Sequence, residues 1–355
     1  MKHRFVGIDL VKCIAIFFVV SVHFFLNTKF YQTPIIGGNM FLQVNMRWLF
    51  TTCVPLFLIV TGFLQYKKEF NKKYLLSGLL ILITYIIISL ISIWYKIGAL
   101  GQIYSLKAVI KAILNFSGNG YSWYVEMYFG LFLLIPFINL INGELTTKKA
   151  KLSFILILIM LCSISEFGIL PDYWMLLYPI LYYSIGSFIR EYQPKILKLK
   201  SLCFILFLLV IESTITGVYA NRYNNYLFGQ LFDGYGKLFT LVLSVLIFLC
   251  IYDIKLKKIR FWGVIKNISE STLEIYLFSY IFDIYFYQKI IDKQFISQQQ
   301  FLKFYFIIVP LVFIFSYFSA SIFKFFLGEC LVLLNNTKVK IISLTGEKIG
   351  KDKKI

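Results

Sequence analysis

Long apolar runs alternate along the chain with short polar segments that are rich in lysine. Each run holds roughly 20 residues, the length that one α-helix needs to cross the hydrocarbon core of a membrane. The pattern predicts an all-α polytopic membrane protein, in which about ten transmembrane helices form a single bundle. The predicted runs are 5–26, 46–66, 74–96, 121–141, 152–170, 173–190, 201–220, 233–252, 268–288 and 301–326.

The composition agrees with this class of protein. Hydrophobic residues make up 59% of the chain, charged residues only 15%, and the mean hydropathy is +0.78. Soluble domains carry about 25% charged residues, so an ordinary cytosolic enzyme, a disordered protein and a secreted disulfide scaffold are excluded. The six cysteines lie in or beside apolar runs without CxxC spacing. They therefore indicate neither a disulfide framework nor a metal site.

The distribution of basic residues predicts the orientation. Of the 36 lysines and arginines, 24 lie in one set of alternating segments, which includes both ends of the chain. Basic loops face the cytoplasm, so both termini are expected there, in a multi-pass protein of the cell membrane. The same distribution argues against nucleic acid as the partner of the +19 net charge. We expect a membrane domain over 1–334 and a basic cytoplasmic tail over 335–355.

The first run carries three ionisable residues: Asp9, Lys12 and His23. Asp9 and Lys12 are three residues apart, so they share a helix face and can pair. His23 follows Lys12 by eleven residues, close to three full turns and roughly 16 Å along the same face. Snorkelling at the helix end is an alternative for the first two, and an interhelical hydrogen bond is one for His23. The functional interpretation of His23 is a general base.

The fourth run begins with Trp123 and Tyr124, followed by Glu126. A carboxylate inside a membrane needs a cationic partner. We expect Glu126 to orient or charge His23, which lies at a comparable depth; pairing with Arg47 is the alternative. Trp123 and Tyr124 are typical of an interfacial aromatic belt, or they form a platform on which a sugar ring stacks.

Charged residues elsewhere are less informative. The loop after the second run contains Lys68, Lys72 and Lys73. It is either an ordinary cytoplasmic loop or a clamp for a phosphate-bearing donor such as a coenzyme A ester, since lysine binds phosphate as a point charge. Asp283 lies toward the outer end of the ninth run, and Glu212 lies midway along the seventh; the sequence names a partner for neither.

Four segments, read together, resemble the membrane acyltransferase 3 family. They span roughly residues 4–290, and their order and spacing carry the resemblance more than any one segment does. They are the Ile8-Asp9 pair with Lys12 and His23, the Pro55-Leu56-Phe57 and Thr61-Gly62-Phe63 sequence, the stretch from Trp123 to Pro136, and the stretch from Ser269 to Leu277.

The chain departs from the family pattern at three places. Lys12 stands where the family has arginine, which keeps the charge but loses the bidentate fork. Thr61 stands where the family has serine. The family's Arg-x-x-Arg motif is not present as such. Lys72 and Lys73 match its basic start, and Leu75 and Leu76 stand where its second arginine would fall.

The resemblance implies an enzyme that moves an acyl group, often acetyl, from cytoplasmic acyl-CoA to a glycan or lipid on the outer side, with His23 as a catalytic residue. We therefore expect an O-acetyltransferase that uses acetyl-CoA as donor substrate, without a permanently bound cofactor or metal, and acts on a surface polysaccharide or its lipid-linked precursor. An exporter of such an intermediate and a structural scaffold are the alternatives. Whether His23 activates the acceptor or first takes the acyl group is open. The assigned roles are catalysis for His23 and Glu126, donor binding for Asp9, Lys12, Lys68, Lys72 and Lys73, and acceptor binding or pocket lining for Arg47, Thr61, Trp123 and Tyr124.

Overall fold

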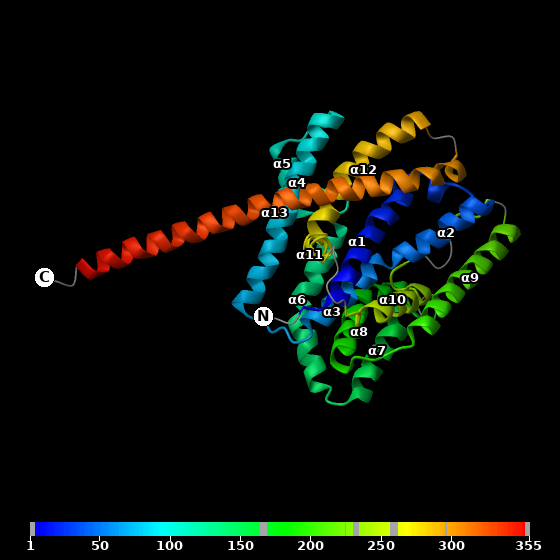
Figure 1. The fold of residues 1–355 in the computed structure, drawn as a ribbon, viewed down its shortest axis with the longest axis horizontal. Helices are drawn as coiled ribbons and strands as arrows, with labels where there is room; N and C mark the ends of the chain where they lie inside the picture. Colours follow the sequence, from blue (N-terminus) through cyan, green and yellow to red (C-terminus); the bar gives the residue numbers. More distant parts are fainter. Residues whose placement is uncertain are drawn as a thin grey trace.

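The computed structural model describes residues 4–163, 169–223, 225–229, 234–255, 262–294 and 297–351. In these residues every regular element is a helix (Figure 1). The elements are α1 (Val6–Leu26), η1 (Phe30–Gln32), α2 (Gly38–Thr51), α3 (Cys53–Gln65), α4 (Lys72–Leu100), α5 (Leu106–Leu114), α6 (Trp123–Glu144), α7 (Lys148–Ser163), η3 (Asp172–Leu177), α8 (Tyr178–Tyr192), α9 (Lys198–Arg222), α10 (Leu238–Ile251), α11 (Trp262–Glu270), α12 (Thr272–Gln294) and α13 (Gln298–Lys351).

The fold confirms an all-α membrane protein. Within the described residues, six stretches are long and apolar enough to cross a membrane: α1, the α2–α3 pair, α4, α6, α9 and the Gln298–Glu329 part of α13. A helix lies in each of the ten predicted runs, but α7, α8 and α10 have only 14 to 16 residues. The number of spans therefore stays a prediction, as does the location of the termini.

The second span is broken in the middle. Gly38–Gln65 is a continuous apolar stretch, yet the structure divides it at Thr52 into α2 and α3. Pro55 lies in the first turn of α3 and has no backbone N–H to bond the preceding turn, so the helix restarts here at little cost. After this break, α3, which carries Thr61, packs against α1.

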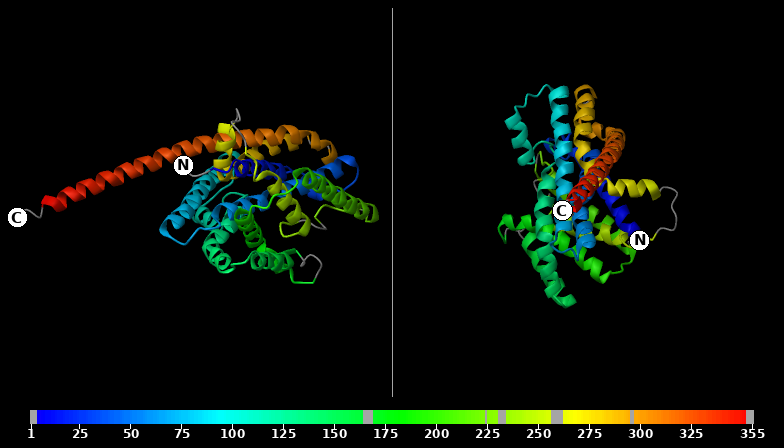
Figure 2. Two further views of the ribbon diagram at one scale, coloured as in Figure 1. Left: turned by 60° about the horizontal axis from the view of Figure 1, so that its bottom comes forward. Right: turned by 90° about the vertical axis from the view of Figure 1, so that its left-hand side faces the viewer.

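Helix α1 lies at the centre of the bundle. It packs against α2, α3 and α10 through α13, so most of its side chains are buried. Helix α13 runs along the outside of the bundle and extends well beyond it, toward the end at which α1 begins (Figures 1 and 2). Its backbone stays helical across residues 334 and 335, where the sequence predicts the tail to start. We refer below to the two ends of the bundle as the Val6 end and the Leu26 end of α1.

Two glycines let the backbones of α3 and α8 approach each other closely. A Cβ atom added to Gly62 would overlap the carbonyl oxygen of Tyr183, and one added to Gly186 would overlap that of Ile59. Small residues of this kind bring backbones together where lipid supplies no hydrophobic driving force between helices. The contact fixes the second half of α8 beside the last turns of α3.

We expect Gly62→Ala to destabilise the protein by about 1–3 kcal/mol, because the added methyl must push two backbones apart. Thermal unfolding in detergent measures the effect. Gly130→Ala is the matched control: Gly130 lies in α6 with open space around its Cβ position. Equal unfolding temperatures for both variants would contradict the close α3–α8 contact.

Candidate functional site

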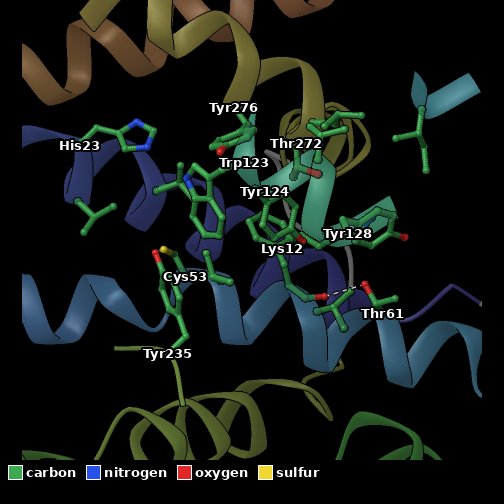
Figure 3. A pocket seen from close by; sticks show the side chains of 18 of the residues that line it. Lys12, His23, Cys53, Thr61, Trp123, Tyr124, Tyr128, Tyr235, Thr272 and Tyr276 are labelled. Atoms are coloured by element: carbon green, nitrogen blue, oxygen red, sulfur yellow. Dashed lines mark hydrogen bonds between the residues drawn. The ribbon is translucent and has the colours of Figure 1, made fainter. Parts of the chain in front are cut away.

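A cavity of about 300 Å³ lies beside α1 and joins its two polar ends. Lys12 lines it toward the Val6 end, and His23 lines it toward the Leu26 end (Figure 3). The walls come from α1, α3, α6 and α12, with Tyr235 closing one side. The predicted stripe along the first helix therefore faces one continuous space.

His23 is almost fully buried, with 3% of its surface exposed, and faces a carboxylate from α12. Its Nδ1 atom lies 3.4 Å from Oδ2 of Asp283, whose own exposure is 0%. This distance is longer than a good hydrogen bond but within the range of an ion pair; such contacts often tighten when substrate binds. Because Nδ1 faces Asp283, Nε2 is the ring nitrogen left available to a ligand.

Tyr121 holds the two partners in place. Its ring stacks on the imidazole of His23 with a centroid distance of 3.7 Å, and its hydroxyl donates to Oδ2 of Asp283 at 2.7 Å. The same hydroxyl accepts from Nδ2 of Asn27, the C-cap residue that follows α1, at 2.8 Å. Tyr276 donates its hydroxyl to the backbone carbonyl of Tyr121. The carboxylate, the ring and the end of α1 thus form one connected network.

The Val6 end is held by a different set of contacts. Asp9 accepts hydrogen bonds from Arg4 and Ser269, and Lys12 donates to the backbone carbonyl of Ser269 at 3.1 Å. The predicted pairing of Asp9 with Lys12 is therefore not what the structure shows, because Arg4 reaches Asp9 first. The carbonyl of Ser269 is exposed to Lys12 because α11 ends at Glu270 and α12 restarts at Thr272.

Three of the remaining predicted pocket residues line the cavity: Thr61, Trp123 and Tyr124. Arg47 does not. Its Nε donates to the hydroxyl of Tyr31, and its guanidinium lies over the rings of Tyr31 and Phe228.

Glu126 does not face His23, which corrects the predicted pair. Its side chain is exposed, and Glu126 is not one of the described residues that line the cavity. The reason is helical phase. Trp123, Tyr124 and Tyr128 face the cavity, and at 100° per residue Glu126 falls on the opposite side of α6. Asp283 occupies the position that the sequence assigns to Glu126. The sequence holds one signal for this pair: His23 and Asp283 each lie near the end of their run that the basic residues predict to be the outer one.

The predicted donor lysines separate in space. Lys68 lines a second cavity, at the Val6 end of the bundle. Lys72 and Lys73 begin α4, where Asn71 caps the helix by accepting from the backbone N–H of Tyr74 at 2.9 Å. Both of these lysines are exposed and line neither cavity, as far as the described residues go.

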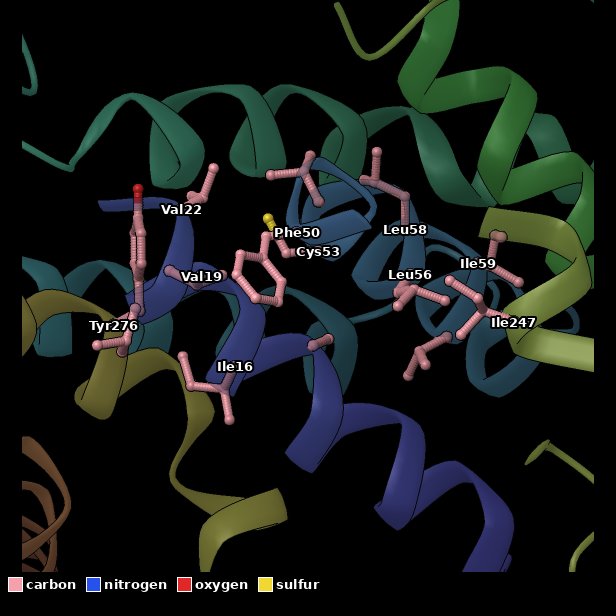
Figure 4. Packing of buried hydrophobic residues seen from close by; sticks show 14 of the residues in the cluster. Ile16, Val19, Val22, Phe50, Cys53, Leu56, Leu58, Ile59, Ile247 and Tyr276 are labelled. Carbon is pink, nitrogen blue, oxygen red and sulfur yellow. The ribbon is translucent and has the colours of Figure 1, made fainter. Parts of the chain in front are cut away.

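The walls between the two polar ends are apolar and aromatic. Val19, Val22 and Cys53 line the cavity and belong to the buried core behind it (Figure 4). Such a lining keeps water away from a reacting group and strengthens electrostatic interactions inside. Among the described residues, no three His, Cys, Asp or Glu side chains are grouped so as to hold a metal ion. The arrangement suits proton abstraction by His23 in a narrow, mostly apolar space.

Comparison with known proteins gives one result. Residues 5–321 match a family model, acyltransferase 3, whose description is "Acyltransferase domain". No curated protein and no solved structure matches the chain.

Proposed function

Because the chain belongs to the acyltransferase 3 family, over nearly its whole length, we propose that it is a membrane O-acetyltransferase. It takes an acetyl group from acetyl-CoA at the cytoplasmic side and transfers it to a hydroxyl of a surface polysaccharide or of its lipid-linked precursor. The observation that carries the proposal is the His23–Asp283 pair, which stands at one end of a cavity that begins at Lys12.

His23 acts as the general base. Its Nε2 takes the proton of the acceptor hydroxyl while the oxygen attacks the thioester carbonyl. The C–S bond then breaks, an ester forms, and the thiolate of coenzyme A leaves and receives the proton. Asp283 stabilises the imidazolium that exists between these steps, because a buried charge needs a paired opposite charge. Tyr121 keeps the carboxylate and the ring aligned.

The topology that serves this reaction has about ten spans in the cell membrane and both termini in the cytoplasm. The Val6 end of α1, where Lys12 lies, is then the donor side, and the Leu26 end is the acceptor side. The excess of basic residues in alternating segments supports this orientation.

The acceptor side offers a surface for a sugar ring. The indole of Trp123 is 39% exposed and stacks on Tyr235, with ring centroids 5.6 Å apart. Both rings line the His23 cavity. Aromatic faces present apolar area together with a polar edge, and this suits a ring with hydroxyl groups.

We expect Lys12→Met to lower the rate of ester formation about tenfold or more, because a hydrogen bond to a charged group contributes about 1.5–3 kcal/mol. Lys12→Arg keeps the charge and is expected to retain most of the activity. Initial rates of acetyl transfer in membrane preparations measure both. Equal rates for Lys12→Met and the unchanged protein would remove Lys12 from the donor path.

The proposed function is tested by alkali-labile acetate on surface glycans of cells that lack the protein. Complementation with the unchanged gene is expected to restore the acetate, and complementation with His23→Ala is not. Glycans that carry no ester in any strain, but fail to reach the surface without the protein, would indicate export and contradict acyl transfer.

A further inference from the structure

A second cavity, of about 640 Å³, lies at the Val6 end of the bundle and is separate from the His23 cavity. We call it the basin. It is formed by the segment after α3, the last two turns of α6 and the end of α8. Its charged lining residues are Lys67, Lys68, Glu69, Lys151, Arg190 and Glu191.

Arg190 is fixed in the basin by aromatic rings. Its guanidinium carbon lies 4.1 Å from the ring centroid of Phe5, 5.0 Å from that of Phe63 and 5.8 Å from that of Tyr66. Gly186 stands one turn before Arg190 on α8, so the close α3–α8 contact sets this position. Among the described residues no carboxylate or carbonyl accepts from the guanidinium. Its fork of N–H donors lies over these rings and, within the described part of the chain, stays available to a ligand.

Other donors line the same basin: the exposed Lys67 and Lys68, and Asn142. Lys68 has no hydrogen-bond or ion-pair partner among the described residues, and the ammonium of Lys67 rests over the ring of Tyr66 at 5.2 Å. Nδ2 of Asn142 is buried within the described structure and lacks a hydrogen-bond partner. A buried donor without an acceptor is costly, so the basin is arranged for an anion that accepts several hydrogen bonds.

The backbone beneath these donors is fixed. Asn139 on α6 donates to the carbonyls of Gln65 and Lys68, both at 2.8 Å, and accepts from the hydroxyl of Tyr183 at 2.7 Å. The segment after α3 is thus tied to α6 and α8. Lys151, by contrast, pairs with Glu191 at 2.6 Å and is already neutralised.

We propose that the basin binds a phosphate group of the donor, with Arg190 as a bidentate ligand. This inference rests on the proposed function and assigns to it a donor subsite. A planar guanidinium matches two phosphate oxygens. The ring pair of Phe70 and Phe137 at the basin, 6.3 Å apart, offers an aromatic wall for the adenine base.

The basin and the His23 cavity share a wall. Helix α6 lines the His23 cavity with Tyr128 and the basin with Asn139. Between them Gln65 donates from Nε2 to the hydroxyl of Tyr128 at 3.2 Å. A donor whose phosphates lie in the basin passes its thioester arm along α6 and past this hydrogen bond. The subsite differs from Lys72 and Lys73, which line neither cavity within the described residues.

A truncated donor tests the subsite. In Arg190→Gln we expect KM for acetyl-CoA to rise about 10- to 100-fold, because the variant loses one or two charge-assisted hydrogen bonds to the donor phosphate. We expect little change in kcat. S-acetylpantetheine lacks the nucleotide, so its kcat/KM is expected to be the same for the variant and the unchanged protein. Lys68→Gln is expected to act in the same direction more weakly. Lys198→Gln is the matched control, because Lys198 pairs with Asp253 outside the basin.

Binding of adenosine 3′,5′-bisphosphate to the purified protein gives a readout that is independent of transfer. Binding that weakens in Arg190→Gln and not in Lys198→Gln supports the proposal, even if no acceptor is ever acetylated and the proposed function fails. Equal binding by all variants overturns it. Equal losses with acetyl-CoA and S-acetylpantetheine overturn it too, because Arg190 would then be structural. A third outcome also overturns it. If Arg190→Gln weakens binding of vesicles that contain phosphatidylglycerol but leaves binding of adenosine 3′,5′-bisphosphate unchanged, the basin binds a lipid headgroup.

Discussion

His23→Ala is expected to lower the rate of acetyl transfer by about 100- to 10,000-fold, the range that a positioned general base contributes. The residue is 3% exposed, and its side chain lines the cavity and presents Nε2 to it, because Nδ1 faces Asp283. The rate is measured with radiolabelled acetyl-CoA and glycan acceptor in membranes that hold equal amounts of protein. KM for acetyl-CoA is expected to change little, because the phosphate subsite that we propose lies at the Val6 end of the bundle, away from His23.

Two controls separate catalysis from folding. His23→Gln keeps a hydrogen-bonding side chain of similar size but cannot take up a proton, so it is expected to be as inactive as His23→Ala. The unfolding temperature of both variants in detergent shows whether the stack on Tyr121 is needed for stability. Full activity of either variant in a properly inserted protein would exclude His23 as the base.

Asp283→Asn is expected to lower kcat by about 100-fold or more while leaving KM for both substrates nearly unchanged. The amide keeps the shape of the carboxylate but removes its charge, and breaking a buried ion pair costs about 3–5 kcal/mol. The penalty falls on the state in which the imidazolium of His23 exists, which is formed during transfer. Steady-state kinetics with acetyl-CoA measures the split between kcat and KM.

Glu126→Gln is the matched control, since Glu126 is the carboxylate that the sequence places near His23 and the structure places on the opposite face of α6. It is expected to keep nearly the full rate. Tyr121→Phe removes the donor to Asp283 and the acceptor for Asn27 but keeps the charge of Asp283, so its loss is expected to be smaller than that of Asp283→Asn. A large loss in Glu126→Gln together with an active Asp283→Asn would reverse the assignment of the two carboxylates.

The polar face of the first helix was predictable because helical geometry is local. The eleven-residue spacing of Lys12 and His23 fixes their common face and separation before any tertiary contact is known. The structure places both residues on the wall of one cavity. The predicted partner of Asp9 is wrong for an equally local reason: Arg4, just before α1 and five residues from Asp9, donates to its carboxylate.

The partner of His23 was not predictable in the same way. Asp283 and Glu126 are both acidic residues near the end of an apolar run that is predicted to be the outer one, and depth alone does not distinguish them. What distinguishes them is which face of its helix each residue occupies once α6 and α12 are packed around α1. The basin poses the same problem, because Arg190 and Lys68 are more than 100 residues apart and meet only after α3 and α8 have packed.

From the sequence alone came the class of the protein, its helical runs and the helix that carries His23, because hydrophobicity and helical period act over a few turns of one segment. The tertiary structure alone decided that Asp283 faces His23, that Glu126 does not, and that Arg190 lines a basin whose donors lack acceptors among the described residues. These are relations between helices, and they depend on rotation about each helix axis and on close contacts such as that of Gly62 with Gly186. Such relations are set by packing over the whole bundle, which no single segment encodes.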